Sequence, residues 1–449
     1  MKRSTASVLT VVCVVLLVGC AQPRPFDDLW VDARPYRAEM PATRPPADVL
    51  ERDGRSAQAV AISNPQGAIA LHDAVALALR QNPTLKANGW AATAAEADAL
   101  QMGRPRNPTA SVGFEKIGES NAEQTLRISQ VIELAAKREK RQQLGEARQK
   151  LAAWDYETLR IDTAATTAER FVAVLVAQER VSLAQRQLKL AETAYAIAKD
   201  RADNGTRPGF ERDQATARVA LIRIELDTAK EGLASTRADL AASWGATEPI
   251  FDAVSGTLEE QSDLPPIDTL QARLPQSPNV ARWADEIAMR EQAIELERAN
   301  AVTDPSLGGG VRYLSDRDEA VGVAEVSWPL PLLDKNEHGI LAARLRLSQT
   351  IAEQESAQAE ASRQLARAYA QAKAANQTLA TLRTEAIPAA EAAYQATLKA
   401  YEAGQAEYLV VLDTERSLLD LQSLKLDAAL NYHQAIISLE HITASPLNE

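Results

Sequence analysis

The chain of 449 residues has few of the residues that build compact cores or catalytic sites. It contains two cysteines, four histidines and only 4% aromatic residues. Two cysteines cannot form a disulfide framework or a cysteine-based metal site. The scarcity of Phe, Tyr and Trp removes the side chains that bury most area in a globular core. Length alone would suggest two or three globular domains, and these shortages argue against that arrangement.

What the sequence has instead is helix-forming residues and acidic charge. Its hydrophobic fraction of 46% comes largely from Ala, Leu, Val and Ile, set in long tracts rich in Ala, Glu, Gln and Arg. This composition is typical of long helices or coiled coils. The 61 acidic residues outnumber the 49 basic ones and give a net charge of -12. This balance argues against a nucleic-acid partner held by a broad basic surface.

The first twenty residues have the pattern of a bacterial secretory signal. Two basic residues precede an apolar run over 8–18, which is too short to span a membrane as a mature helix. Small residues directly before Cys20 resemble a lipobox, at which the signal peptide (1–19) is removed and the cysteine is diacylated. An uncleaved anchor, or an ordinary signal with an incidental cysteine, is the alternative. We expect lipidation of Cys20, followed by an extended tether over 20–70.

The rest of the chain is internally duplicated. The segment 191–195 (AETAY) recurs as 390–394 (AEAAY), 199 residues further on. Matches at nearly the same spacing extend across the whole region, so we predict two copies of one unit. The first repeat covers 71–264 and the second covers 265–449.

Each repeat has the same predicted order of elements: a helix, a β-hairpin, a very long helix, a glycine turn and a return helix. At about 1.5 Å per residue, a tract of about 70 residues would extend roughly 100 Å. We expect a break at Asn82-Pro83 in the first helix, and a kink or break at Pro388 in the second long helix. The first repeat has its helix at 71–102, β-hairpin at 109–132 and helical hairpin at 133–244; the second has them at 278–302, 306–329 and 334–442.

The β-hairpin segments alternate apolar and polar residues with a period of two. This alternation over nine or ten residues, with polar turns between, fits transmembrane strands. Two solvent-facing hairpins capping a helical bundle are the alternative. The lipobox and the missing globular core favour the membrane.

Four strands per chain cannot close a barrel, and open strand edges are not tolerated in hydrocarbon. Two copies would give eight strands, a barrel whose interior is filled by side chains, whereas three copies would give twelve and leave a lumen. We therefore predict a homotrimer with a 12-stranded β-barrel. The residues expected to face its lumen are Glu115, Arg127, Arg312 and Glu325.

The duplicated plan of helical hairpins, opened in its first copy by 71–83 (LHDAVALALRQNP), resembles one known family, the TolC-like outer membrane efflux proteins. Three further motifs are 107–108 (NP), 128–134 (ISQVIEL) with 137–138 (KR), and 327–336 (SWPLPLLDKN). They look like the heavy-metal branch of that family, which serves cobalt-zinc-cadmium type pumps, although Ala135 and Ala136 stand where that branch more often has glycine.

The resemblance implies a mainly α fold with transmembrane β structure. A trimeric outer-membrane barrel would continue into a periplasmic helical tunnel, with a mixed α and β belt formed by about 245–275 and the C-terminal segment. The implied partners are a periplasmic adaptor (membrane fusion protein), a proton-driven inner-membrane pump of the resistance-nodulation-division (RND) type, and outer-membrane lipid. The implied function is passive conduction of heavy-metal cations, and export of drugs or organic solvents stays open.

The resemblance also implies a gate and a docking region at the two glycine turns. The family closes its tunnel with acidic rings and charged contacts just after these turns. For each acidic residue carried over, a solvated helix-surface carboxylate is the alternative. The gate candidates are Glu211, Glu407 and Asp413, and the adaptor-contact tips are Gly205, Arg207 and Gly404.

The sequence contains no constellation typical of an enzyme. The four histidines are scattered, and the acidic pairs lie on polar helices where they are usually solvated. We expect no catalytic residues, no metal site and no cofactor. A periplasmic coiled-coil adaptor or structural lipoprotein is a further hypothesis, but an adaptor usually has one helical hairpin, whereas this chain has two in equivalent places.

Overall fold

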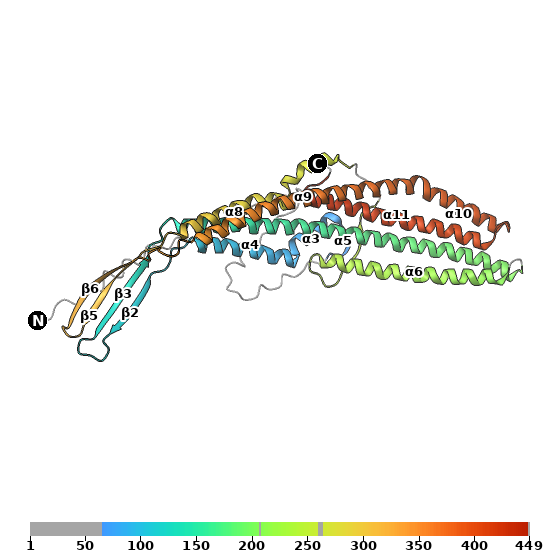
Figure 1. Ribbon diagram of the computed structural model, residues 1–449. Coiled ribbons are helices and arrows are strands. Elements are labelled where there is room, and N and C mark those ends of the chain that lie inside the picture. The colour runs from blue at the N-terminus through green and yellow to red at the C-terminus, as the bar shows by residue number, and fades with distance from the viewer. Residues whose placement is uncertain (1–64, 206–207, 259–263, 448–449) are drawn as a thin grey trace. The chain divides into compact units, whose positions relative to one another are not determined.

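The computed structural model describes residues 65–205, 208–258 and 264–447 (Figure 1). The predicted signal peptide, Cys20, all of the tether up to residue 64 and Arg207 lie outside the described residues. The described part is mainly helical with a small number of strands, as predicted.

The helices follow the order expected for a duplication. Those of the first half are α3 (Leu71–Gln81), α4 (Pro83–Met102), α5 (Lys137–Asp203) and α6 (Gly209–Ala242). Those of the second half are α7 (Ile267–Arg273), the 3₁₀ turn η3 (Leu274–Gln276), α8 (Pro278–Asn300), α9 (Glu337–Thr381), the π turn η4 (Leu382–Ala386), α10 (Ile387–Glu402) and α11 (Tyr408–Thr443).

The first predicted helix breaks at Asn82, as expected. The Asn82 side chain accepts a hydrogen bond from the Leu85 N–H at 2.9 Å and so caps α4. Pro83 occupies the first turn of α4, where its missing N–H costs nothing. The Asn82 amide also donates to the Ser243 carbonyl at 2.9 Å, which fixes the break against the end of α6.

The two long tracts differ at the proline. α5 runs for 67 residues without a proline. In the second half, the tract is divided into α9, η4 and α10, and Pro388 lies in the first turn of α10. Proline clashes with the carbonyl one turn earlier and cannot donate to it. The π turn just before Pro388 widens the helix there, so the chain continues without a sharp break.

Six strands form two sheets within the described residues. β2 (Thr109–Glu115), β3 (Glu123–Val131), β5 (Ser306–Leu314) and β6 (Glu319–Ser327) form an antiparallel sheet in the order β2-β3-β5-β6. β1 (Gly67–Ala70) pairs in parallel with β4 (Phe251–Ser255). The tether prediction was therefore wrong for residues 67–70, because those residues complete a small sheet that packs on α5. β4 and α7 lie within the segment expected to form the mixed belt.

The helices form an open row. Near the sheet, α4 packs on α5, α5 on α8, and α8 on α9, so α4 and α9 stand at the two ends of this row. β2 follows α4 and β6 precedes α9, so the ends of the helix row correspond to the edges of the sheet. Further along, α6 runs back beside α5, and α11 packs along α9, α10 and α5 (Figure 1).

Candidate conduction and gating site

The four-stranded sheet has one charged face and one apolar face. In the observed register, Glu115 lies opposite Glu123, Arg127 opposite Gly310, and Arg312 opposite Thr125. Because side chains alternate along a strand, all charged residues of these strands share one side, which we call the polar face. They are Glu115, Glu123, Arg127, Arg312, Glu319 and Glu325.

The four residues predicted to face a lumen therefore lie on the same face, and three of them take part in ion pairs across the strands. Arg127 pairs with Glu325, and the Arg312 guanidinium lies 2.9 Å from the Glu123 carboxylate. Glu123 was missed from the sequence, although the period-two alternation through Arg127 and Thr125, continued back by two residues, would have found it.

One of these ion pairs crosses a whole strand at a glycine run. Arg127 is on β3 and Glu325 is on β6, with β5 between them. A Cβ atom on Gly308 would make an ordinary contact with the Arg127 side chain, at 3.4 Å, whereas one on Gly310 would clash with the Leu126 carbonyl oxygen. Glycine is thus required at Gly310, where the backbones of β3 and β5 approach closely.

The opposite side of the sheet, which we call the apolar face, carries large hydrophobic side chains that are exposed in the single chain. A continuous surface of this kind marks a contact with lipid or with another protein. Its exposed members are Val112, Phe114, Leu126, Ile128, Leu307, Val311, Tyr313 and Val326.

The junction between sheet and helices contains strained backbone. Ala135 and Ala136 have φ of 53° and 54°, in the left-handed region that favours glycine. Lys137, which is buried at the start of α5, pairs with Asp304 at 2.6 Å, and Asp304 also accepts the Leu134 N–H at 2.9 Å. These contacts hold the chain through the strained turn where β3 becomes α5.

The two glycine turns lie at the other end of the long helices. Gly205 and Gly404 have φ of 70° and 79°, which allows the sharp reversal, and both are exposed. Among the gate candidates, Glu407 and Asp413 are exposed. Glu211 is only 5% exposed.

The buried Glu211 connects the two helical hairpins. Its carboxylate accepts a hydrogen bond from the Tyr401 hydroxyl at 3.1 Å. Glu211 lies on α6 of the first hairpin, and Tyr401 lies on α10 of the second. The Tyr401 ring also packs against Tyr408, with 5.6 Å between ring centroids, and lies 4.6 Å from the Arg201 guanidinium. This bond ties the hairpins together next to their tips.

A second buried contact, further from the tips than the Tyr401–Glu211 bond, also joins the two hairpins, and it was missed from the sequence. Glu415 on α11 is 1% exposed, and the Arg218 guanidinium of α6 lies 3.2 Å from one of its oxygens. Burial raises the pKa of Glu415, and Arg218 only partly opposes this effect. The signal was present, because Val411, Glu415 and Leu418 follow the i, i+4, i+7 pattern of a buried helix stripe.

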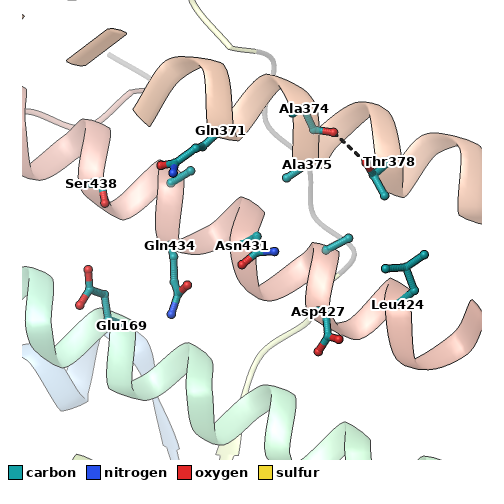
Figure 2. A pocket seen from close by; sticks show the side chains of 12 residues that line it. Glu169, Gln371, Ala374, Ala375, Thr378, Leu424, Asp427, Asn431, Gln434 and Ser438 are labelled. Atoms are coloured by element: carbon teal, nitrogen blue, oxygen red, sulfur yellow. Dashed lines mark hydrogen bonds between the residues drawn. The ribbon is translucent and has the colours of Figure 1, made fainter. Parts of the chain in front are cut away.

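A polar groove of about 750 Å³ lies between α5, α9 and α11. Figure 2 shows Glu169 of α5 opposite Gln434 of α11, with Asn431 and Asp427 further along α11. Asp427 pairs with Arg180 at 2.6 Å, so this carboxylate is balanced by a cation. Apart from Leu424, the groove is lined by hydroxyl, amide and carboxylate groups and by alanines, which suits a water-filled surface.

Two kinds of feature are absent from the described residues. No group of three or more His, Cys, Asp or Glu side chains in this part of the chain could hold a metal ion. Within the same residues, no helix is both long and apolar enough to cross a membrane.

Comparison with known proteins identifies the family. The model of the outer membrane efflux protein family matches residues 74–246 and 269–445. The cobalt-zinc-cadmium resistance protein CzcC of Cupriavidus metallidurans is 28% identical over 376 residues, which cover 84% of this chain and 90% of that protein. The nickel-cobalt-cadmium resistance protein NccC of Alcaligenes xylosoxydans xylosoxydans is also 28% identical, over 63% of this chain and 65% of its own length.

A solved structure shows the same fold. The structure of CusC, described as a transmembrane channel, has a TM-score of 0.73 and covers 84% of this chain and 92% of its own, at 17% sequence identity. The two family matches also fall one in each of the predicted repeats. The resemblance noted from the sequence is confirmed: the chain belongs to the outer membrane efflux protein family and is similar to its heavy-metal resistance members.

Proposed function

We propose that this chain forms a passive outer-membrane conduit for heavy-metal cations, with no catalytic step of its own. The observation that carries the proposal is the open sheet with all its charge on one face and exposed hydrophobic side chains on the other. In a closed barrel, the polar face would line the lumen, and the apolar face would contact lipid. The metal specificity is inferred from relatives whose names record resistance to cobalt, zinc, cadmium and nickel.

The conduit is proposed to be a homotrimer. The edge strands β2 and β6 carry unpaired backbone groups, which hydrocarbon does not tolerate. Pairing β2 of one copy with β6 of the next would satisfy these groups and give twelve strands. The same closure would bring α4 of one copy to α9 of its neighbour, which would extend the barrel into a periplasmic tunnel.

The partners are proposed to act at the opposite end. The turns at Gly205, Arg207 and Gly404 would contact a periplasmic adaptor, which would connect the channel to a proton-driven inner-membrane pump of the RND type. Residues 1–19 would be removed as a signal peptide, and Cys20 would carry the lipid that anchors the N-terminus. Multiple acyl chains hold a protein firmly at a membrane, whereas one chain does so weakly.

The gate is proposed to lie just inside these tips. The Tyr401–Glu211 hydrogen bond joins the two hairpins of one chain and would keep them together in the closed state. Glu407 and Asp413 are exposed and would contribute acidic charge to the narrow end of the tunnel. An acidic passage attracts cations without binding them tightly, as a conduit requires.

Deletion of the gene and complementation would test the cargo. We expect the deletion strain to become sensitive to at least one of zinc, cobalt, cadmium and nickel, and the intact gene to restore resistance. Unchanged metal tolerance together with new sensitivity to drugs or organic solvents would assign the channel to a different cargo. Loss of palmitate labelling in Cys20→Ala would test the lipid anchor separately.

A further inference from the structure

The segment that connects β6 to α9 exposes an unusual amount of apolar surface. In this junction loop, residues 328–334, the side chains of Leu330, Leu332 and Leu333 are 70%, 77% and 102% exposed, and Trp328 is 58% exposed. The three leucines line one side of a groove of about 730 Å³ whose other side includes Glu297 and Asn300 of α8, and their high exposure shows that they make little contact with their own chain. Contiguous exposed hydrophobic residues indicate a contact surface.

The loop continues the apolar face of the sheet. Val326 is the last apolar-face residue of β6, and it is also exposed. Trp328, Leu330, Leu332 and Leu333 follow within seven residues of it and are exposed too, although they lie beyond β6, which ends at Ser327. Exposed hydrophobic residues therefore continue past the end of the strand.

We propose that the junction loop is a membrane anchor, in which Trp328, Leu330, Leu332 and Leu333 insert into the phospholipid leaflet at the periplasmic edge of the barrel. This proposal rests on the proposed membrane-inserted barrel. It adds a lipid contact outside the strands and assigns it to four side chains.

The backbone of the loop suits such an environment. Pro329 and Pro331 have no N–H group, so two donors that hydrocarbon would leave unsatisfied are absent. The Leu332 N–H donates to the Leu330 carbonyl at 2.9 Å. The Trp328 indole N–H donates to the Thr303 hydroxyl at 3.0 Å, which leaves its ring exposed in the manner of aromatic residues at membrane interfaces.

Charged residues follow directly after the exposed leucines of the junction loop. Asp334 and Lys335 are both exposed, and the Asp334 carboxylate accepts the Asn336 N–H at 2.8 Å. Charged residues are costly inside hydrocarbon, so this pair marks the point where the chain returns to water. The corresponding connection of the first repeat is held by Lys137 and Asp304, so the anchor is a feature of the second repeat.

β6 is slightly too short to span the apolar band of an outer-membrane barrel, and the junction loop would cover the remaining depth. Nine residues at about 3.3 Å each make a strand about 30 Å long. Tilted by about 40°, the strand would span about 23 Å, slightly less than the apolar band of about 25 Å typical of outer-membrane barrels. Hydrophobic side chains just beyond the strand would cover the remaining depth.

Spin labelling of the full-length protein in vesicles of phosphatidylethanolamine and phosphatidylglycerol tests the proposal. A nitroxide is attached at Leu332→Cys, and its accessibility to oxygen and to a water-soluble nickel chelate is measured by power saturation. We expect oxygen access to exceed chelate access, as for a matched label at Val326→Cys on the apolar face. A label at Glu337→Cys, which lies past the charged pair, should show the reverse, and protein without an introduced cysteine gives the background.

Other accessibilities of the label at Leu332 would contradict the proposed membrane anchor. Low access to both reagents at Leu332 would mean that a second copy of the chain covers the loop, and high chelate access would mean that it faces water. If Val326 also failed to show oxygen access, the inserted barrel itself would be wrong, so the two failures are distinguishable. As a second measurement, lipid brominated near the headgroup should quench a fluorescence component that is lost in Trp328→Phe; equal quenching in both proteins would also contradict the proposal.

Discussion

The hydrogen bond between Tyr401 and Glu211 offers a specific perturbation of the gate. Tyr401→Phe removes the hydroxyl that donates to the Glu211 carboxylate and retains the ring that packs on Tyr408 and Arg201. The substitution therefore deletes one contact between α10 and α6 without emptying the buried site. We expect the closed state to lose stability relative to the open state.

The size of the effect follows from the bond. A hydrogen bond to a charged group contributes about 1.5–3 kcal/mol. If each chain opens independently, the ratio of its closed to its open population should fall roughly 10- to 100-fold, because about 1.4 kcal/mol corresponds to a factor of ten. If three chains open together, the combined loss is about 4.5–9 kcal/mol, against about 5.5 kcal/mol needed to change a population from 1:99 to 99:1.

Single-channel recording in planar bilayers measures this change as higher mean conductance or open probability. Tyr394→Phe is a matched control, because Tyr394 is buried like Tyr401, but its hydroxyl has no hydrogen-bond partner among the described residues. We expect Tyr401→Phe to raise conductance and Tyr394→Phe to leave it unchanged. Unchanged conductance of intact Tyr401→Phe trimers, or an equal rise in both variants, would refute the gate role.

Three further predictions concern stability and assembly. Ala136→Gly should stabilise the protein by about 1 kcal/mol, because its left-handed backbone strains alanine; an unchanged or lower midpoint in thermal circular dichroism would show that the strain is absent. Gly310→Ala should reduce the yield of detergent-stable trimers, because its Cβ would meet the Leu126 carbonyl oxygen, and wild-type yield would contradict that close approach. Burial raises the pKa of Glu415 in the folded state, so the folded protein binds this proton more tightly than the unfolded chain and gains stability as the pH falls through the raised pKa towards the ordinary value of 4.5. The melting temperature of wild type should therefore rise relative to that of Glu415→Gln as the pH falls from neutrality, whereas a constant difference would mean that Glu415 does not titrate in this range.

The features that were predictable from the sequence are periodic or repeated. The absence of proline within 137–203 allowed α5 to be predicted as one very long helix, and the alternation around Arg127 and Arg312 placed both on one face of the sheet. These patterns depend on local geometry, which the residue order records directly.

The features that were missed depend on contacts between distant segments. Residues 67–70 form a strand only because β4 lies beside them, and Glu211 acquires its partner from α10, which follows it by 190 positions. Pro388 led us to predict a kink or break in the second long helix. The structure has a π turn there instead, a local geometry that the sequence pattern does not specify. Glu415 likewise acquires its partner, Arg218, from α6, which lies far from it in the sequence.

The central claim is that assembled copies of this chain form a passive, cation-conducting pore. The most direct test is the reversal potential of the purified, reconstituted protein under a salt gradient in planar bilayers, recorded with potassium and then with zinc as the cation. We predict stable conductance steps whose reversal potential lies towards the cation equilibrium potential. A protein that inserts but conducts no ions, or one that prefers anions, would contradict the account.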